Sequence, residues 1–408
     1  MSEIPSGTLP SGDTASRPTI RLQPSRHKRV QHGHPWVYSN EIHMDNSAKA
    51  IPPGTVVRVV THDGAPLGAA TFNPHTLICT RMLARDPGAE IDKAFLAGRL
   101  RRALGLREKL FDRPYYRLVH AEADGLPALI VDRFGDVVVM QANSAGMDRL
   151  TPVLLEALDE VLAPKAVVLR NDSPSRGLEG LATGVRVASG SLEGPVRLEE
   201  NGAAFFADPG AGQKTGWFYD QRDNRAAIAA LARGADVIDF YSYNGGFAVQ
   251  CAKAGAKSVV AVDRSEAALA NGRAAAEANG VGSVCEFRRA DAFEELERLA
   301  AAGATFGVVI ADPPAFVKSK KDLQAGTRAY RKMTRLAASI TAPGGFLLVA
   351  SCSHNVDVPL FAEQVARGLD DARRTGRILR TGGAAADHPV HPHLPETAYL
   401  KAQILQLD

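Results

Sequence analysis

The sequence predicts an α/β protein whose carboxyl-terminal half is a doubly wound, mostly parallel sheet. This sheet is preceded by a small all-β barrel and an α+β middle domain. The first observation is that residues 202–408 alternate short apolar strand patterns with amphipathic helical patterns. The second is that residues 19–93 are rich in β-branched residues and turn signals such as IPPG and THDG. The third is that residues 94–201 mix helical and hairpin patterns.

The amino-terminal half is expected to hold a tail and two domains. Residues 1–18 are rich in Ser, Gly, Pro and Thr, which predicts a disordered tail. TVVRVV and LICTRML are the strand candidates of the barrel. In the middle domain, the spacing of Leu96, Leu100 and Leu104 predicts a helix over 95–110 with an Arg-rich outer face. ALIVDRFGDVVVMQA then predicts a hairpin, LTPVLLEALDEVL a helix and AVVLRND a further strand.

The carboxyl-terminal domain reads as strands separated by helices. The expected strands are DVIDFY, SVVAVD, SVCEFRRA, FGVVIAD, GGFLLVAS, RILR and AYLKAQILQL. The last of them follows a loop rich in His and Pro instead of a crossover helix. We therefore expect this final strand to run antiparallel at the edge of the sheet.

Composition narrows the class of protein. The 408 residues carry a net charge of +3, and the four cysteines include no Cys-x-x-Cys pair, which disfavours structural zinc and a disulfide framework. Because no apolar run approaches membrane-spanning length and no signal peptide is present, we expect a cytoplasmic protein. Basic residues gather in segments 17–29 and 318–335. Such a segment is often only a solvated face, but the second one adjoins the presumed pocket, which favours binding to a polyanion such as RNA.

A cofactor site is predicted at the end of the first strand of this sheet. The strand runs into Asp239, Tyr241, Ser242, Asn244, Gly245 and Gly246, where glycines let the backbone approach a ligand closely. The string is not Gly-x-Gly-x-x-Gly, so it suits S-adenosylmethionine better than a dinucleotide. Asp263 ends the next strand, where it could accept hydrogen bonds from both ribose hydroxyls, and Asp291 could bond the adenine amino group. Each carboxylate alone is more often a helix cap, but all of them occur here in the expected order.

Two strings predict the reacting group. Asp312-Pro313-Pro314-Ala315-Phe316 and Ser351-Cys352-Ser353 each follow an apolar strand, so both should lie at the carboxyl edge of one sheet. A rigid acidic and aromatic corner beside a cysteine suggests that a flat heterocycle is held and attacked by sulfur. For an arbitrary cysteine a buried structural thiol is the better interpretation. We apply it to the other three cysteines, Cys79, Cys251 and Cys285.

At this point the sequence resembles the class I S-adenosylmethionine-dependent methyltransferases that act on carbon 5 of cytosine in large-subunit ribosomal RNA. The resemblance covers nearly the whole chain. It rests on HPWVYSNEI in a module similar to a PUA domain, YRLVHAEADGLPALIVDRFGD in the middle domain, and GQKTGWFYDQRDNR, VIDFYSYNGGF, ADPPAFVKSK and SCSHNV in the last domain. It implies a Rossmann-like domain with a seven-stranded, mostly parallel sheet over 202–408.

The chemistry of this family implies a role in the reaction for residues of the Asp-Pro-Pro and Ser-Cys-Ser strings. Carbon 5 of cytosine becomes nucleophilic only after a nucleophile adds to carbon 6, and Cys352 is the expected nucleophile. A depressed thiol pKa is expected from Ser351, Ser353, His354 and the nearby basic loop. Asp312 would stabilise charge that develops on the ring, and Phe316 would stack on a base flipped out of its helix.

The resemblance also implies that Lys214 and Arg222 contact the methionine carboxylate of the cofactor, and that Asp312 is part of the cofactor site as well. Many related enzymes carry a second cysteine in the Asp-Pro-Pro region, but here Pro314 and Ala315 occupy it. The base that removes the carbon 5 proton is not named by the sequence.

Several alternatives stay open. The cluster His388, His391 and His393 is interpreted as a rigid loop and not as a metal site, because no cysteine or carboxylate supports it. Other enzymes with Asp-Pro-Pro-aromatic strings methylate an exocyclic amine, which needs no covalent nucleophile. A non-catalytic RNA-binding or ribosome-assembly factor is a third hypothesis. The sequence does not settle the target nucleotide, whether free RNA or a ribosomal particle is the substrate, or whether the protein is a homodimer.

Overall fold

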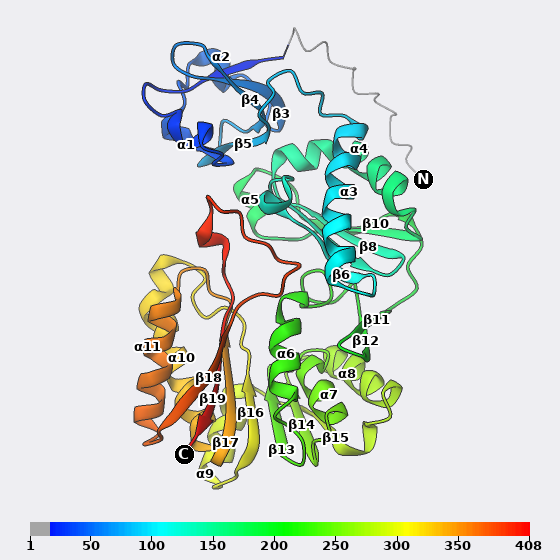
Figure 1. The fold of residues 1–408 in the computed structure, drawn as a ribbon, viewed down its shortest axis with the longest axis vertical. Coiled ribbons are helices and arrows are strands. Elements are labelled where there is room, and N and C mark those ends of the chain that lie inside the picture. The colour runs from blue at the N-terminus through cyan, green and yellow to red at the C-terminus, as the bar shows by residue number, and fades with distance from the viewer. Residues whose placement is uncertain (1–16) are drawn as a thin grey trace.

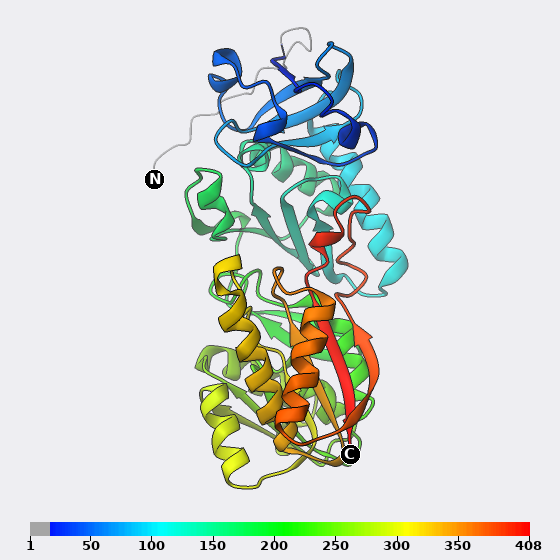
Figure 2. The ribbon, with the colours of Figure 1, turned by 90° about the vertical axis from the view of Figure 1, so that its left-hand side faces the viewer.

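The computed structural model describes residues 17–408, which form three bodies stacked along the long axis of the molecule (Figures 1 and 2). The tail expected over 1–18 lies outside the described residues except for its last two positions. The middle body lies between the amino-terminal sheet and the carboxyl-terminal domain. The carboxyl-terminal domain therefore faces the middle body with one end of its sheet (Figure 1).

The amino-terminal body is a five-stranded sheet in the order β1-β3-β4-β5-β2, as the all-β prediction requires. Its core is formed by apolar side chains on one face of these strands, among them Val57, Val59 and Phe72. Its elements are β1 (Thr19–Arg21), α1 (Lys28–Gln31), β2 (Trp36–Tyr38), η2 (Ser39–Glu41), α2 (Asn46–Lys49), β3 (Thr55–Val60), β4 (Pro66–Phe72) and β5 (Ile78–Ala84).

The middle body is a second five-stranded sheet, in the order β10-β9-β8-β7-β6, covered by two long helices. The predicted hairpin is present, with Gly135 at its turn in the left-handed region. The elements are α3 (Lys93–Leu110), β6 (Tyr115–His120), η3 (Ala121–Asp124), β7 (Leu129–Phe134), β8 (Val137–Ala142), α4 (Ala145–Leu162), β9 (Ala166–Asn171), α5 (Ser175–Leu178) and β10 (Gly184–Gly190).

One expectation for α3 is wrong. The outer face was predicted to carry the arginines, but Arg107 is fully buried. Its guanidinium donates to both carboxylate oxygens of Asp124, at 2.6 and 2.8 Å, and to the carbonyl of Asp387, at 2.9 Å. A planar guanidinium with matched acceptors can be buried where an unpaired charge could not.

The carboxyl-terminal body is a seven-stranded sheet in the order β15-β14-β13-β16-β17-β19-β18, preceded by a two-stranded hairpin. The elements are β11 (Val196–Glu200), β12 (Ala203–Ala207), η4 (Tyr219–Gln221), α6 (Arg222–Ala229), β13 (Asp236–Phe240), α7 (Gly246–Lys253), β14 (Ser258–Asp263), α8 (Glu266–Ala278), η5 (Gly282–Val284), β15 (Cys285–Arg289), α9 (Ala292–Ala301), β16 (Phe306–Ala311), η6 (Lys320–Asp322), α10 (Leu323–Ser339), β17 (Thr341–Ser351), α11 (Val358–Asp371), β18 (Gly376–Gly382), η7 (Pro395–Thr397) and β19 (Lys401–Leu407).

The final strand is antiparallel, as predicted, but it is not at the edge. β19 pairs antiparallel with both β17 and β18, so it lies between them and β18 forms the edge. Its sequence KAQILQL is buried at six of seven positions, which an interior strand requires. A strand that is inserted between two earlier ones needs long-range pairing that no local pattern reports.

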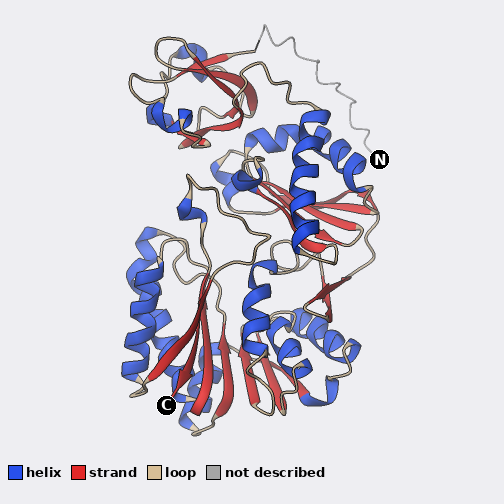
Figure 3. Ribbon diagram, in the orientation of Figure 1, coloured by secondary structure: helices blue, strands red, loops and turns tan. Residues whose placement is uncertain are grey.

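Helices cover both faces of this sheet (Figure 3). The core on one face joins the sheet to α9, α10 and α11, and the core on the other face joins it to α6 and α7. Burial on both faces explains why the strands read as continuous apolar runs. No helix within residues 17–408 combines the length and the apolar character needed to span a membrane.

The loop 383–400 leaves the sheet and reaches the middle body (Figure 1). There the Asp387 carboxylate accepts a hydrogen bond from the backbone N–H of Arg117, at 2.9 Å. The ring Nδ1 of His388 donates to the same carboxylate, at 2.8 Å. The loop therefore fixes the middle body over the carboxyl edge of the large sheet.

Candidate active site

A cavity of about 790 Å³ opens at the carboxyl edge of the seven-stranded sheet. This is the position at which open α/β sheets bind ligands. Its walls come from the ends of β13, β14, β16 and β17, from the segment 213–225, and from the loop before β19. The middle body contributes Arg117 and Gln141. Two bodies of the chain therefore enclose one site.

The turn after β13 forms one wall of the cavity with an unusual backbone. Tyr241 and Tyr243 have φ of 62° and 48°, and Gly245 has φ of 74°. For a residue with a Cβ this left-handed conformation is costly, and it persists where the surrounding structure imposes it, often at a ligand site. Tyr241, Ser242 and Gly246 line the cavity. The turn leads directly into the amino-terminal end of α7, which therefore lies beside the cavity.

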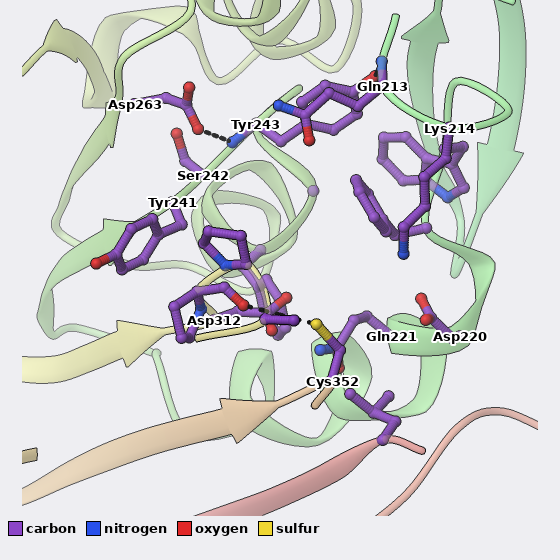
Figure 4. Close-up of a pocket in the computed structure, with 18 of the residues that line it drawn as sticks. Gln213, Lys214, Asp220, Gln221, Tyr241, Ser242, Tyr243, Asp263, Asp312 and Cys352 are labelled. Carbon is purple, nitrogen blue, oxygen red and sulfur yellow. Dashed lines mark hydrogen bonds between the residues drawn. The ribbon is translucent and has the colours of Figure 1, made fainter. Parts of the chain in front are cut away.

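Asp263 and Asp291 line the same end of the cavity. Asp263 accepts backbone N–H groups of Tyr243, at 2.9 Å, and Ser265, at 2.8 Å, and Figure 4 shows the first of these bonds. Asp291 caps α9 and pairs with Arg264 at 3.0 Å. Carboxylate oxygens have further acceptor capacity, so both residues can also receive a ligand hydroxyl or amine.

Three other predicted cofactor residues lie behind this wall and do not line the cavity. The buried Asp239 carboxylate accepts from the N–H of Ala248, at 3.1 Å, and burial followed by the Asp312 carboxylate raises its pKa well above the ordinary value. Asn244 donates to the carbonyl of Phe206, at 3.0 Å. Gly245 approaches Gly272, where a Cβ would come within 3.3 Å of its Cα. These residues hold the turn in shape.

Lys214 lines the cavity, but Arg222 does not. Arg222 is buried against the middle body, where it donates to the carbonyl of Tyr115 and lies over the ring of Phe111, 4.4 Å from its centroid. The predicted contact with the methionine carboxylate has no support at Arg222. Arg225, one turn later, lines the cavity, pairs with Glu200 at 2.7 Å and lies over the Trp217 ring.

The two reaction strings meet in the cavity. The Cys352 thiol points at the carbonyl of Pro313, with Sγ and O 3.9 Å apart (Figure 4). Ser353 joins the two loops, because its hydroxyl accepts from the N–H of Val317 at 3.1 Å and bonds the hydroxyl of Tyr330 at 2.9 Å. The Asp-Pro-Pro corner and the cysteine loop therefore form one rigid unit.

The surroundings of Cys352 contradict the expected depression of its pKa. Burial raises the pKa of the thiol, Lys214 lowers it, and the carboxylates of Asp312 and Asp220 raise it, with a net rise. The sequence suggested the opposite because the basic segment 318–335 was expected to lie near Cys352. The carboxylates that face the sulfur come from segments 40 and 132 residues away in sequence.

Asp312 is unusual among the cavity carboxyls. Burial and then the Asp220 carboxylate raise its pKa to about 7, although Arg225, Lys214 and a hydrogen bond from Gln221 act in the opposite direction. Near neutral pH a large fraction of this group is therefore a neutral acid. A neutral carboxyl donates a hydrogen bond, which a carboxylate cannot do.

Phe316 lines the cavity beside these groups. Its ring packs against Tyr330, with centroids 4.7 Å apart, and against Phe293, at 5.8 Å. It therefore forms part of an aromatic cluster at the cavity wall.

Several lining residues were missed by sequence reasoning. Arg117, Asp220, Gln221 and Tyr399 all line the cavity. The Tyr399 hydroxyl donates to Oδ2 of Asp220. Asp220 and Gln221 stand in the string GQKTGWFYDQRDNR, which was interpreted mainly through Lys214 and Arg222, so a polar signal was present there. Tyr399 and Arg117 had no such local signal.

Comparison with known proteins shows which families and which proteins this chain is similar to. Residues 20–85 match the PUA-like domain family, and residues 185–403 match the S-adenosylmethionine-dependent methyltransferase family. The chain is 37% identical to ribosomal RNA large subunit methyltransferase I of Shewanella denitrificans over 95% of this chain and 99% of that protein. The protein of the same name from Shewanella frigidimarina is 36% identical over the same shares.

The chain belongs to the ribosomal RNA large subunit methyltransferase I family. Two solved structures share the fold of this family member. An S-adenosylmethionine-dependent methyltransferase from Streptococcus mutans superposes with a TM-score of 0.80 at 19% identity, covering 95% of this chain and 100% of that one. A methyltransferase complexed with SAH gives 0.81, with the same identity and coverage. At this identity the likeness concerns the fold.

The cavity of this methyltransferase fits S-adenosylmethionine. The buried hydroxyl of Ser242, which lines the cavity, has no hydrogen-bond partner among the described residues, at the turn where a ligand would supply one. Acidic groups at Asp263 and Asp291 suit hydroxyl and amino groups. Within residues 17–408 no group of three His, Cys, Asp or Glu side chains is arranged to hold a metal ion, and His388 instead bonds Asp387.

Proposed function

We propose that this protein methylates carbon 5 of a cytosine in large-subunit ribosomal RNA, through a transient covalent bond between Cys352 and carbon 6. The observation that carries the proposal is the meeting of Cys352 and Asp312 in one cavity, at a sheet edge that also presents the cofactor turn. A sulfur nucleophile is what carbon 5 chemistry requires and what amine methylation does not.

Asp312 supplies the proton that this addition needs. When the sulfur of Cys352 bonds carbon 6, negative charge develops on the ring, and the neutral Asp312 carboxyl gives its proton to ring nitrogen 3. The raised pKa of Asp312, about 7, keeps this proton available near neutral pH. The amide of Gln221 bonds Asp312 and holds it in place.

Lys214 helps to form the sulfur nucleophile. The pKa of the Cys352 thiol is raised by burial, and the charge of Lys214 is the largest of the influences that oppose this rise. The Lys214 ammonium lies 4.6 Å from the centroid of the Phe218 ring, which fixes its position by a cation–π contact. Its charge therefore favours the thiolate at the moment of attack.

S-adenosylmethionine supplies the methyl group when it is bound. Tyr241, Ser242, Asp263 and Asp291 would hold it, since all four line the cavity and the first three lie at the end away from Lys214. Figure 4 shows Tyr241 and Asp263 at this end, and Cys352 between them and Asp220.

The RNA would be held by basic side chains outside the cavity. We propose residues 19–93 as an RNA-binding module, residues 94–201 as a spacer that closes the site, and residues 202–408 as the catalytic domain. Lys318, Lys320, Lys321 and Arg328 are exposed on the segment that follows the Asp-Pro-Pro corner. They can neutralise phosphates next to a base inserted in the cavity. Because ribosomal RNA is cytoplasmic in bacteria, the cytoplasm is the proposed location.

Release of tritium from RNA tests this function. RNA labelled at carbon 5 of cytosine must lose its tritium to water when carbon 5 is methylated, whereas methylation of the exocyclic amine leaves the label in place. We expect one tritium released for each methyl group incorporated into a 23S ribosomal RNA transcript. Methyl incorporation without release of tritium would show the alternative reaction.

A further inference from the structure

The base that removes the carbon 5 proton can be sought among the groups that line the cavity. After methyl transfer, carbon 5 carries both the methyl group and its original proton, and the bond from carbon 6 to sulfur must break. A suitable base is an ionised group with a free acceptor atom near Cys352. The described residues of the cavity offer four carboxylates, at positions 220, 263, 291 and 312, and imidazoles at positions 354 and 388.

Most of these groups are engaged or misplaced. Asp263 accepts two backbone N–H groups, and Asp291 caps a helix and pairs with Arg264, both at the cofactor end. Asp312 is proposed to act as the acid at nitrogen 3. The two imidazoles fit the role no better. His388 is 1% exposed at its side chain and is bound to Asp387.

His354 is a poor base because its environment disfavours the imidazolium. Burial and the Lys401 ammonium lower the pKa of His354, the backbone of Glu396 raises it, and Lys214 lowers it further. Its ring also lies against Tyr399, with centroids 5.2 Å apart.

Asp220 has the required free atom. The residue is 5% exposed, Oδ2 accepts from the Tyr399 hydroxyl, and Oδ1 has no partner among the described residues. A buried carboxylate oxygen without a donor is costly unless a ligand or water supplies one. In Figure 4 Asp220 lies at the end of the cavity opposite Asp263 and Tyr241. A base there is on the far side of Cys352 from the cofactor end.

The charges around Asp220 keep it ionised. Burial opposes ionisation, but His388, Lys214, the Tyr399 hydroxyl and Arg117 outweigh it, so the pKa of Asp220 lies below its ordinary value. Asp312 has its pKa shifted in the opposite direction. Two neighbouring carboxyls with opposite shifts suit one acid and one base in the same reaction.

We propose that Asp220 is the general base that takes the carbon 5 proton and releases the methylated base from Cys352. The inference rests on the proposed function. In this step an O–H bond forms on Asp220 and the C5–H bond breaks. Its electron pair forms the double bond between carbons 5 and 6, and the bond from carbon 6 to sulfur breaks to regenerate the thiolate. Nitrogen 3 returns its proton to Asp312, and Asp220 passes its own proton to solvent.

The test compares full-length wild type with Asp220→Asn on two forms of a 23S ribosomal RNA transcript. With 5-fluorocytosine RNA neither protein needs a base to form the adduct, so both should be trapped equally. With ordinary cytosine RNA and methyl-labelled cofactor, the variant should accumulate a labelled covalent complex and turn over about 100-fold or more slowly. Wild type should show no such accumulation.

The control variants separate a base from a structural role. Asp223→Asn neutralises an exposed carboxylate that is close in sequence but does not line the cavity, so it should not accumulate the adduct. Formate should restore part of the turnover of Asp220→Ala. Cofactor affinity by calorimetry checks that each variant is folded.

The outcomes are distinguishable. If wild type traps no fluorinated RNA, the proposed function fails, and this inference fails with it. If wild type is trapped but Asp220→Asn turns over normally, or fails to trap the fluorinated RNA, Asp220 is not the base and the proposed function stands.

Discussion

At the scale of a single residue, the raised pKa of Asp312 lowers the stability of the folded protein but keeps a proton available for the reaction. Its environment favours the neutral carboxyl, with a pKa of about 7. Because the unfolded chain ionises this group at lower pH, the folded state binds more protons between about pH 4 and pH 7. Stability must therefore fall as pH rises through this window.

The variant Asp312→Asn should remove this pH dependence. At pH 5 the wild type and the variant should unfold at similar temperatures. At pH 8 the unfolding temperature of the variant should rise relative to that of the wild type, because only the wild type then buries a charge. Differential scanning fluorimetry at several pH values measures the difference. Asp223→Asn, which alters an exposed carboxylate, is the control. If the unfolding temperatures of Asp312→Asn and wild type differ by the same amount at pH 5 and pH 8, the raised pKa of Asp312 is contradicted.

Residue types at strand ends were predictable, but their electrostatics were not. Cys352, Asp312 and Asp263 could be placed at the sheet edge because each directly follows an apolar strand. The pKa of Cys352 could not be predicted, because it depends on Asp220 and Lys214 across the cavity. Such contacts are fixed by tertiary structure and leave no local pattern.

At the scale of elements, the packing of α3 against the loop before β19 links the middle body to the site. Arg107 on this helix binds Asp124 and the carbonyl of Asp387, and Asp387 in turn holds the backbone of Arg117. Arg117 lines the cavity. A helix that reads in sequence as ordinary and amphipathic therefore supports the active site.

Replacing Arg107 by Met should be strongly destabilising. The change leaves Asp124 and the Asp387 carbonyl without their donor in a buried place, at a cost of about 3 kcal/mol or more. Arg101→Met on the same helix is the matched comparison, because its pair with Glu160 is exposed to solvent and contributes little to stability. Thermal unfolding of both variants measures the difference. Equal effects would show that the buried pair does not stabilise the junction.

The elements themselves were largely predictable, since their periodicities are local. The strands of the seven-stranded sheet follow the apolar runs of the sequence, and the helices follow the amphipathic ones. The order of the last two strands was not predictable, because β19 inserts between β17 and β18 by long-range pairing. The burial of Arg107 was missed for the same reason, as its partners lie 17 and 280 residues away.

At the scale of the whole molecule, the three stacked bodies present basic side chains near the mouth of the cavity. Lys318, Lys320 and Lys321 are exposed directly after the Asp-Pro-Pro corner. Arg331 and Lys332, further along, are engaged with Asp371 and Glu297. The first group is therefore free to meet phosphates, and the second is not.

Removing the positive charges of the free lysines should weaken RNA binding more than removing those of the paired residues. Changing Lys318, Lys320 and Lys321 together to Gln should weaken binding to 23S ribosomal RNA and reduce the slope of log affinity against log salt by about 2. The double change Arg331→Gln and Lys332→Gln should alter the slope by less than 1 or so on the same scale. Filter binding at several salt concentrations measures both slopes. Equal slopes for wild type and the triple variant would contradict the proposed RNA path.

The central claim is that Cys352 forms a bond to carbon 6 of a cytosine in RNA. Incubation of the full-length protein with S-adenosylmethionine and 23S ribosomal RNA carrying 5-fluorocytosine tests it, because fluorine at carbon 5 blocks release. We expect a complex that survives denaturation, with the nucleotide mapped by mass spectrometry to the peptide containing Cys352, and no complex from Cys352→Ala. No complex from the wild type, or an undiminished one from Cys352→Ala, would contradict the account.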